Sequence, residues 1–567
     1  MFDRACFACF LAILAWFFCA GSCGTQFHSA LLKTSGSNSG MAMRMSEAGL
    51  NYINSVALRV VTEELNGLRI RKLQLKLPNG RGKVRLTKVR IRSNGGKSRI
   101  DLTAPNKIKW SVRKLNMKIR TKLGGYVINI LPVVLTGSMH ASSSNIRFEI
   151  TSKISKKSDG SPYMRPVKCR AKIGRMDVNI RNGGLVGLTV QLLKSHGIKT
   201  YKPKIEKAFC KIAQKFIDKD LNKRLSKFPT KMPLSATDSF NFEQILQGNF
   251  QARKRKSGQT EFLQEVLQNL LPQTSDKLQI DYRLVSDPQV KENFLQTSHK
   301  GEISWYGRGG TPFGPPSLGL PSYQSGRRMS YFYVSDFLMN SMLYHATKHD
   351  LLRLRIGPHL SGIGTYMRTT CSDGLSFCLG DFIDGLADEY PDSEVELLIK
   401  PTRAPAIFFS GTNGGTVLAH MDSAMVLFVN LPNGKLRHLL SMESSVKANS
   451  KVWLEFNKIK AKVKFDQVSF RLIKSNLDEF DDDSAKDLEY LVSDVIAMVV
   501  NQFLSKGTPI PDVEGVRLRN QKLVVKQRAI QLSTDFKIDD KSLRKVVRKT
   551  MLKELRGFVS RSFGAKM

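Results

Sequence analysis

Eight Lys or Arg residues and no acidic residue lie in the stretch KLPNGRGKVRLTKVRIRSNGGK at positions 76–97. Apolar residues alternate with these cations, which predicts a strand with one apolar face and one cationic face. The apolar residues are Val84, Leu86, Val89 and Ile91. Pro78-Asn79-Gly80 predicts a turn near the start of the stretch. A row of cations suits phosphate or sulfate groups, which Arg can grip through two hydrogen bonds and Lys contacts as a point charge.

The positive charge of the whole chain is concentrated in its first half. The 567 residues carry a net charge of +41, divided as +36 over residues 1–256, −5 over 257–500 and +10 over 501–567. Residues 51–200 hold 32 basic and six acidic side chains. A single cationic strand is most often a solvated sheet face, but this excess favours a functional surface for a polyanion.

The first residues indicate the compartment in which that polyanion is met. MFDRACFACFLAILAWFFCAGSCG combines Arg4, an apolar run and small residues, as a secretory signal peptide does. We expect a signal peptide over residues 1–23, and a secreted, extracellular protein with no later membrane-spanning helix. This expectation disfavours nucleic acid as the partner.

The cysteines beyond the signal, Cys169, Cys210, Cys371 and Cys378, are even in number and predict two disulfides, of which Cys371 with Cys378 would close a short loop.

Periodicity predicts the elements that position these residues. In the first half we expect a helix from Ser46, as its N-cap, to about Asn66, then strands over 69–182 and a long helix over 185–226 with a break near Pro203. In the second half we expect a helix over 333–350, strands to about 475, a helix over 484–504 and strands over 516–536. The repeated order predicts two similar domains.

Two segments between these halves differ in composition from the rest. Residues 235–276 are polar and Gln-rich, and their Arg253–Lys256 run is either a processing site or a solvated basic loop, the latter being favoured. The Gly- and Pro-rich residues 307–326 predict an extended connector.

Several segments together resemble the bactericidal/permeability-increasing protein and lipopolysaccharide-binding protein family, which includes the plasma lipid-transfer proteins. The resemblance covers most of residues 41–536. It rests on MRMSEAGLNYINSVALRVVTEEL at 43–65, on LQIDYRLVSDPQV, KGEISW, PFGPPSLGLPS and MSYFYVSDFLMNSMLY between 278 and 344, and on GTPIPDVEGVRLRN at 507–520.

The resemblance implies an α+β fold, an elongated two-domain boomerang. Each domain would be a twisted, barrel-like antiparallel sheet wrapped around a long helix, with a central sheet joining the two. The implied divisions are an N-terminal lipid-binding domain over 41–234, an insert and connector over 235–330, a C-terminal lipid-binding domain over 331–536 and a basic tail over 537–567. A phospholipid would occupy an apolar pocket in each domain. Cys169 and Cys210 match the family's single disulfide.

The resemblance also implies where lipopolysaccharide would bind, namely on basic loops at the tip of the N-terminal domain. One matching hairpin supplies Lys76, Arg81 and Lys83, and a second, around a Gly124-Gly125 turn, supplies Lys118, Arg120 and Lys122. Strand order suggests a third tip loop with Lys153, Lys156, Lys157 and Arg165.

The C-terminal tail predicts an amphipathic helix from about Asp540. Lys545, Lys549, Lys553 and Arg556 gather opposite an apolar face that includes Leu555 and Phe558. Such a helix suits an anionic membrane surface. Docking on the body of the protein, or pairing with a second chain, are the alternatives.

Motifs for catalysis or for a cofactor are missing from the sequence. It has no Gly-x-Ser-x-Gly elbow and no His-Glu-x-x-His. His345 and His349 are spaced to share a helix face, but no third metal ligand is evident, so we predict a surface pair and no metal. We therefore expect no enzyme and no cofactor.

The most consistent function is a secreted lipid-binding protein of innate immunity. Its cationic N-terminal domain would bind lipopolysaccharide through lipid A, with antibacterial activity against Gram-negative bacteria. The first alternative is a phospholipid transfer or carrier protein. The second is a glycan or nucleic-acid binder driven by charge alone, which high salt would release.

Overall fold

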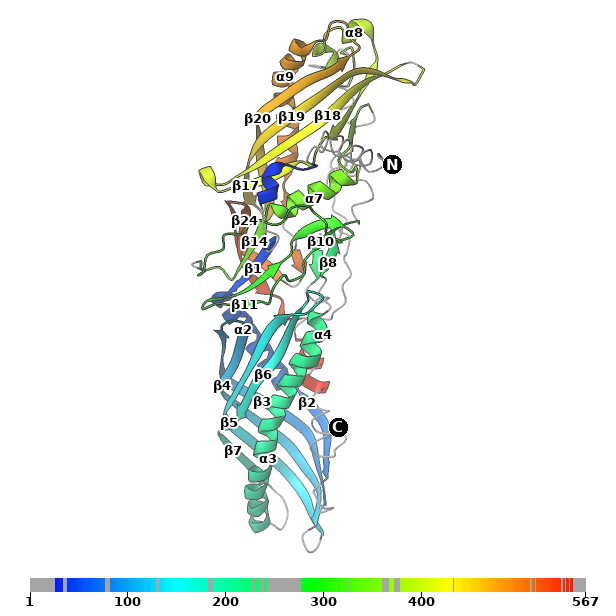
Figure 1. Cartoon of the computed structure of the whole chain (residues 1–567). Helices are drawn as coiled ribbons and strands as arrows, with labels where there is room; N and C mark the ends of the chain where they lie inside the picture. Colours follow the sequence, from blue (N-terminus) through cyan, green and yellow to red (C-terminus); the bar gives the residue numbers. More distant parts are fainter. Residues whose placement is uncertain are drawn as a thin grey trace, which may run out of the picture.

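The chain forms an elongated molecule in which sheets succeed one another along the long axis (Figure 1). It is seen here as a computed structural model. The structure describes residues 26–33, 38–76, 82–128, 132–181, 187–226, 230–234, 239–241, 277–324, 326–358, 367–371, 378–431, 433–509, 512–514, 516–541, 544–545, 547–549 and 551–553. The expected signal peptide and the Arg253–Lys256 run lie outside these residues. Within them, no helix is long and apolar enough to cross a membrane.

A central sheet combines strands from distant parts of the sequence. Its order is β11-β12-β1-β14-β24-β23-β22-β9. At its middle, β1 (Met41–Ser46) lies between β12 (Phe294–His299) and β14 (Ser330–Ser335), and β24 (Ala529–Ile538) follows. The sheet therefore holds both halves of the chain together, as the resemblance implies.

The N-terminal sheet is built from long antiparallel strands. It has the order β2-β3-β4-β5-β6, with β7 also paired to β5. The bounds are β2 Arg69–Lys76, β3 Gly82–Thr103, β4 Lys107–Ile128, β5 Pro132–Lys156, β6 Pro162–Lys172 and β7 Arg175–Arg181. Helix α2 (Glu47–Gly67) precedes the sheet, and the Ser46 side chain accepts a hydrogen bond from the Gly49 amide, which confirms the predicted N-cap.

Helix α3 (Gly187–Lys215) follows the N-terminal sheet and runs through Pro203 without a break, so the predicted break there is wrong. A proline removes one backbone hydrogen bond, and the rest of a long helix can retain its course. The irregular turn comes later, as a π-helical segment at Phe216–Leu221 before α4 (Asn222–Leu225).

The second half repeats the combination of long strands and one long helix. Its sheet has the order β15-β16-β18-β19-β20-β21, and helix α9 (Asp482–Lys506) packs against β20. The strands are β15 Leu354–Ile356, β16 Glu394–Pro401, β17 Ala406–Ser410, β18 Thr416–Asn430, β19 Leu436–Glu455, β20 Lys458–Ser475 and β21 Thr508–Pro509. A large apolar core lies between sheet and helix, and includes Leu386, Val395, Val429 and Leu440.

Shorter elements connect these layers. Among the described residues they are η1 Ser29–Lys33, β8 Lys231–Pro233, β9 Ser239–Asn241, β10 Leu278–Asp281, β11 Gln289–Val290, β13 Glu302–Trp305, α7 Phe337–Lys348, η6 Leu379–Asp381, α8 Leu386–Glu389, η7 Thr412–Gly414, β22 Asp512–Glu514 and β23 Val516–Lys526. The predicted α+β class is confirmed. The long sheets are open, each with two edge strands, so the expected barrel-like closure is not seen among the described strands.

Candidate functional site: a cationic sheet face

One face of the N-terminal sheet carries the cations that the sequence placed on a strand. Those of β3 are Lys83, Arg85, Lys88, Arg90 and Arg92, and those of β4 are Lys118, Arg120 and Lys122; all are exposed. The other face is apolar, and Leu86, Val89 and Ile91 are buried there with Leu123 of β4. The predicted two-faced strand is confirmed.

A bulge in β3 keeps the cations on one face. The register between β3 and β4 shifts between Thr87 and Arg90, and Lys88 has a positive φ of 53°. An extra residue in a strand reverses which side chains point to each face. The bulge therefore buries the even-numbered Leu86 and the odd-numbered Val89 on the same side.

Like charges lie directly opposite one another across this face. Arg90 of β3 is paired with Arg69 of β2 on one side and with Arg120 of β4 on the other. Arg92 is opposite Lys118, and Lys83 is opposite Lys76. Like charges that lie directly opposite one another on neighbouring strands destabilise a sheet. The sheet thus carries a repulsion that an anionic ligand would relieve.

Among the described residues, no acidic side chain lies directly opposite a cation of these rows on a neighbouring strand. Asp101 and Glu149, both on the same sheet, pair with Arg99 at 2.6 Å and Arg113 at 3.4 Å, outside the cationic rows. Across β4, the residues of β5 opposite Lys118, Arg120 and Lys122 carry no carboxylate: they are Ser142, His140 and Ser138. The face therefore remains a positive field.

The structure places the predicted lipopolysaccharide residues along strands rather than on loops alone. Lys76 ends β2, Lys83 begins the β3 row, and Arg81 lies outside the described residues. Sequence reasoning missed Arg69 and Lys72 of β2 as neighbours of these rows, because only strand pairing brings β2 beside β3.

Gly124-Gly125 is not a turn, contrary to the sequence prediction. Both residues lie inside β4, which continues to Ile128. A Cβ atom on Gly125 would lie 2.0 Å from the Lys83 carbonyl oxygen, and its φ is +128°. Glycine is needed at position 125 because the two strands approach each other closely there. The local sequence does not distinguish such a glycine from one in a turn.

The third predicted tip loop lies at the opposite end of the sheet. The segment after Lys156 contacts the region near the central sheet, where the Asp287 carboxylate accepts a hydrogen bond from the Lys156 amide at 2.8 Å. The Leu284 amide donates to the Gly160 carbonyl at 3.0 Å. Successive hairpin turns alternate between the two ends of a sheet, so this loop cannot share the tip with the β4–β5 turn.

The C-terminal tail is helical at its described positions between 540 and 553, and it docks on the body of the protein. Arg544 forms an ion pair with Glu63 of α2, and Arg548 approaches Glu64 with 2.9 Å between Nε and Oε2. Leu552 packs against the apolar side of the N-terminal sheet. Docking on the body of the protein, one of the alternatives predicted from the sequence, is thus the observed arrangement.

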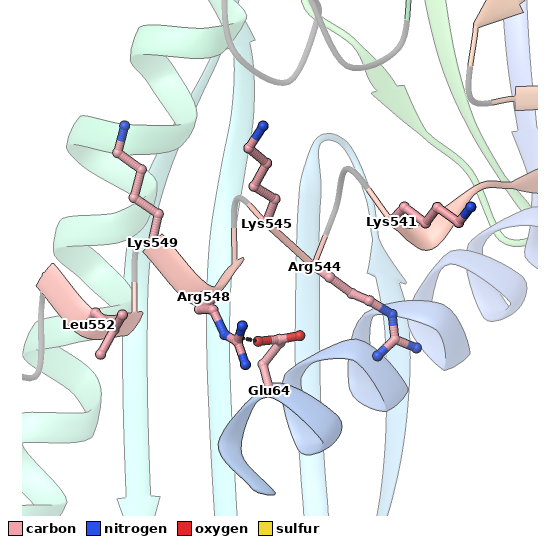
Figure 2. A pocket seen from close by; sticks show the side chains of 7 residues that line it. All are labelled: Glu64, Lys541, Arg544, Lys545, Arg548, Lys549 and Leu552. Atoms are coloured by element: carbon pink, nitrogen blue, oxygen red, sulfur yellow. Dashed lines mark ion pairs between the residues drawn. The ribbon is translucent and has the colours of Figure 1, made fainter. Parts of the chain in front are cut away.

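A cavity of about 580 Å³ lies beside the docked tail. Its lining consists of Glu64, Lys541, Arg544, Lys545, Arg548, Lys549 and Leu552. Figure 2 shows the Arg548 side chain turned toward Glu64 while Lys545 and Lys549 extend the other way. Lys553 is exposed, and Arg556 lies outside the described residues. Lys545 and Lys549 belong to the cationic side predicted from the sequence, and Lys541, at i−4 from Lys545, could have been added to it from the same spacing.

Two disulfides are present, in the pairings considered from the sequence. Cys169 of β6 is joined to Cys210 of α3, which ties the N-terminal sheet to its long helix. Cys371 is joined to Cys378.

His345 and His349 do not form the predicted surface pair, because His345 is buried with 4% of its surface exposed. The His349 ring stacks on Trp305 with 3.9 Å between centroids. Burial lowers the pKa of both histidines. In the described residues, the group of potential metal ligands that lies close together is Cys371, Cys378 and Asp381, whose two sulfurs are bonded to each other.

Comparison with known proteins gives consistent matches. Residues 272–538 match the family model "LBP / BPI / CETP family, C-terminal domain". Bactericidal permeability-increasing protein of Sebastes schlegelii is 23% identical over 88% of this chain and 95% of that protein. Human lipopolysaccharide-binding protein is 23% identical over 86% and 92%. Chicken cholesteryl ester transfer protein is 22% identical over 51% and 56%. A crystal structure of lipopolysaccharide binding protein superposes with a TM-score of 0.49 and 19% identity, covering 88% of this chain and 99% of that one.

Proposed function

We infer from these matches that the chain is a member of the LBP / BPI / CETP family, and we propose that it is a secreted, non-enzymatic protein that binds lipopolysaccharide through lipid A. The binding surface is the cationic face of the N-terminal sheet. Two relatives are named for lipopolysaccharide binding and for bactericidal activity, which supports an antibacterial role in innate immunity. The observation that carries the proposal is the set of like-charge pairs centred on Arg90 and Arg120.

The geometry of the face suits a phosphorylated glycolipid. Alternate side chains along a strand are about 6.6 Å apart, and neighbouring strands are about 4.8 Å apart. The rows of β3 and β4 thus form a grid in which one phosphate can contact two or more cations. Arg90, Arg92 and Arg120 can each donate two parallel hydrogen bonds to a phosphate. Acyl chains would then enter an apolar groove of the same domain.

The test removes the central charges and leaves the fold intact. A variant with Arg90, Arg92, Lys118 and Arg120 changed to Gln should bind lipopolysaccharide at least about tenfold more weakly, since hydrogen bonds to charged groups contribute about 1.5–3 kcal/mol each. Titration calorimetry or surface plasmon resonance measures the affinity, and killing of Gram-negative bacteria measures the activity. Because like-charge pairs are removed, the variant should unfold at the same or a higher temperature.

A matched control changes four exposed cations in the second half of the chain, Lys435, Lys474, Arg517 and Lys522, to Gln. It has the same net charge as the test variant and should keep its affinity for lipopolysaccharide. Equal losses in both variants would favour a binder driven by charge alone. Unchanged affinity in both would contradict the proposed site.

A phospholipid carrier is the second candidate, favoured by the match to a cholesteryl ester transfer protein. A carrier would move phospholipid between vesicles without lipopolysaccharide. It would also keep that activity when the cationic face is neutralised.

The tail contributes a separate proposal. With Arg544 and Arg548 turned toward α2, the docked helix presents Lys549 and Lys553 outward. We propose that these lysines, with Lys545 and Arg556, contact the anionic surface of a membrane after the sheet has bound.

A further inference from the structure

The hairpin of β19 and β20 ends in an exposed aromatic tip. Phe456 and Asn457 form the two-residue turn between Glu455 and Lys458, and the Phe456 side chain is 90% exposed. Trp453, three residues earlier, is 40% exposed. This tip belongs to the second half of the chain, away from the cationic face of the N-terminal sheet.

Phe456 is unfavourable for the folded hairpin in two respects. Its φ is +47° and that of Asn457 is +65°, and a turn with two left-handed residues strongly favours Asn and Gly. A bulky aromatic residue in this region is strained. Its ring also gains almost no burial in return. Strain kept at an exposed position points to a use outside the fold.

The neighbouring residues already satisfy the structural needs of the turn. The Asn457 side-chain oxygen accepts a hydrogen bond from Gln521 Nε2 of β23 at 2.5 Å, which holds the hairpin end against the central sheet. Glu455 accepts hydrogen bonds from Lys460 Nζ at 2.8 Å and from Trp453 Nε1 at 3.4 Å. These contacts lower the pKa of Glu455 and orient the indole.

The strands behind the tip are cationic. Residues 447–464 contain six lysines and one acidic residue, Glu455. Lys451 lies directly opposite Lys462, and Trp453 lies directly opposite Lys460. Lys451, Lys462 and Lys464 are exposed. The tip therefore combines a protruding aromatic pair with positive charge immediately behind it.

We propose that this tip is an anchor for an anionic lipid bilayer. Phe456 enters the boundary between head groups and acyl chains, Trp453 rests at head-group level, and the lysines contact the anionic head groups. A protein partner fits less well, because lysine is depleted at protein interfaces and binding energy there concentrates in central, enclosed pockets rather than at a convex point. The anchor does not depend on lipopolysaccharide and is separate from the proposed function.

Phe456→Asn separates anchoring from folding. Asparagine suits the left-handed turn, so this variant should unfold at the same or a higher temperature than the wild type. Its partition onto phosphatidylcholine vesicles that contain phosphatidylglycerol should fall by about tenfold, because the apolar area that enters the lipid is lost. Cosedimentation of the full chain with vesicles measures the partition.

The matched control is Leu436→Asn, which removes an apolar side chain that is 43% exposed at the other end of β19. This variant should partition onto vesicles as the wild type does. The double variant Lys451→Gln with Lys462→Gln should bind less to vesicles that contain phosphatidylglycerol, and its binding to vesicles of phosphatidylcholine alone should not change. Lipids brominated along the acyl chain should quench the tryptophan fluorescence of the wild type more than that of the Trp453→Phe variant. An unchanged partition for Phe456→Asn, or an equal loss for Leu436→Asn, would overturn the proposal.

Discussion

Single residues decide whether the cationic face can exist. Gly125 allows β4 to approach the Lys83 carbonyl of β3, and Lys88 occupies the bulge that keeps Arg85 and Arg90 on one face. The change from even to odd apolar positions after Leu86 was visible in the sequence and indicated which residues would be buried. The sequence did not show that Gly124 and Gly125 lie within a strand, because glycine is favoured both in turns and where two strands approach each other closely.

Gly125→Ala should destabilise the N-terminal sheet. The added methyl group would lie 2.0 Å from the Lys83 carbonyl oxygen, in a backbone conformation with φ of +128°. We expect a loss of roughly 2–4 kcal/mol, more than the strain of 1–3 kcal/mol alone. Urea unfolding checks this value. Gly434→Ala is the control, because its φ is +74° and nothing lies within 4 Å of an added Cβ; equal losses in the two variants would exclude the steric contact as the cause.

At the scale of elements, strands and helices were predictable and their partners were not. Ser46 capping α2, the helix near Asp482–Lys506 and the long antiparallel strands follow from local pattern. The docking of the tail depends on Glu63 and Glu64, which are far from Arg544 and Arg548 in sequence. The position of the loop after Lys156, by contrast, follows from strand order alone, because successive hairpin turns alternate between the two ends of a sheet.

Substitutions on the two sides of the tail helix should have different effects, one on stability and the other on membrane binding. Arg548→Ala leaves Glu64, whose side chain is 10% exposed, without its counter-charge, and should cost about 1–3 kcal/mol of stability. The double variant with Glu64→Gln should recover much of that loss. Lys549→Gln with Lys553→Gln should leave the unfolding temperature unchanged and weaken binding to anionic vesicles. Vesicle binding equal to that of the wild type would refute the membrane role of the tail.

At the scale of the whole molecule, the cationic face and the histidines with a lowered pKa lie in different regions. The cationic face lies in the first half. The histidines with lowered pKa gather near the central sheet and in the second half, where burial disfavours the protonated ring: His28, His299, His345, His349, His420 and His438. His28, from the N-terminal segment, lies 3.3 Å from His420 of β18, measured between ring nitrogens. This contact was not predictable, because the two residues are distant in sequence.

Stability should therefore fall on acidification. A lowered histidine pKa in the folded state means that the unfolded chain binds more protons as pH drops through about 6.5, so protons favour unfolding. We expect a lower unfolding temperature at pH 5.5 than at pH 7.5. His420→Gln should reduce this difference, since it also removes the positive charge that would face protonated His28. A stability that does not change, or that increases, between pH 7.5 and pH 5.5 would contradict the lowered pKa of these histidines.

The most direct test of the cationic face compares intact lipid A with lipid A from which the phosphates have been removed. Affinity for both is measured for the wild type and for the variant with Arg90, Arg92, Lys118 and Arg120 changed to Gln. We predict that the wild type loses at least about tenfold in affinity when the phosphates are removed, whereas the variant binds both lipids with similar, weak affinity. A variant that still discriminates between the two lipids as strongly as the wild type would show that the phosphates bind elsewhere.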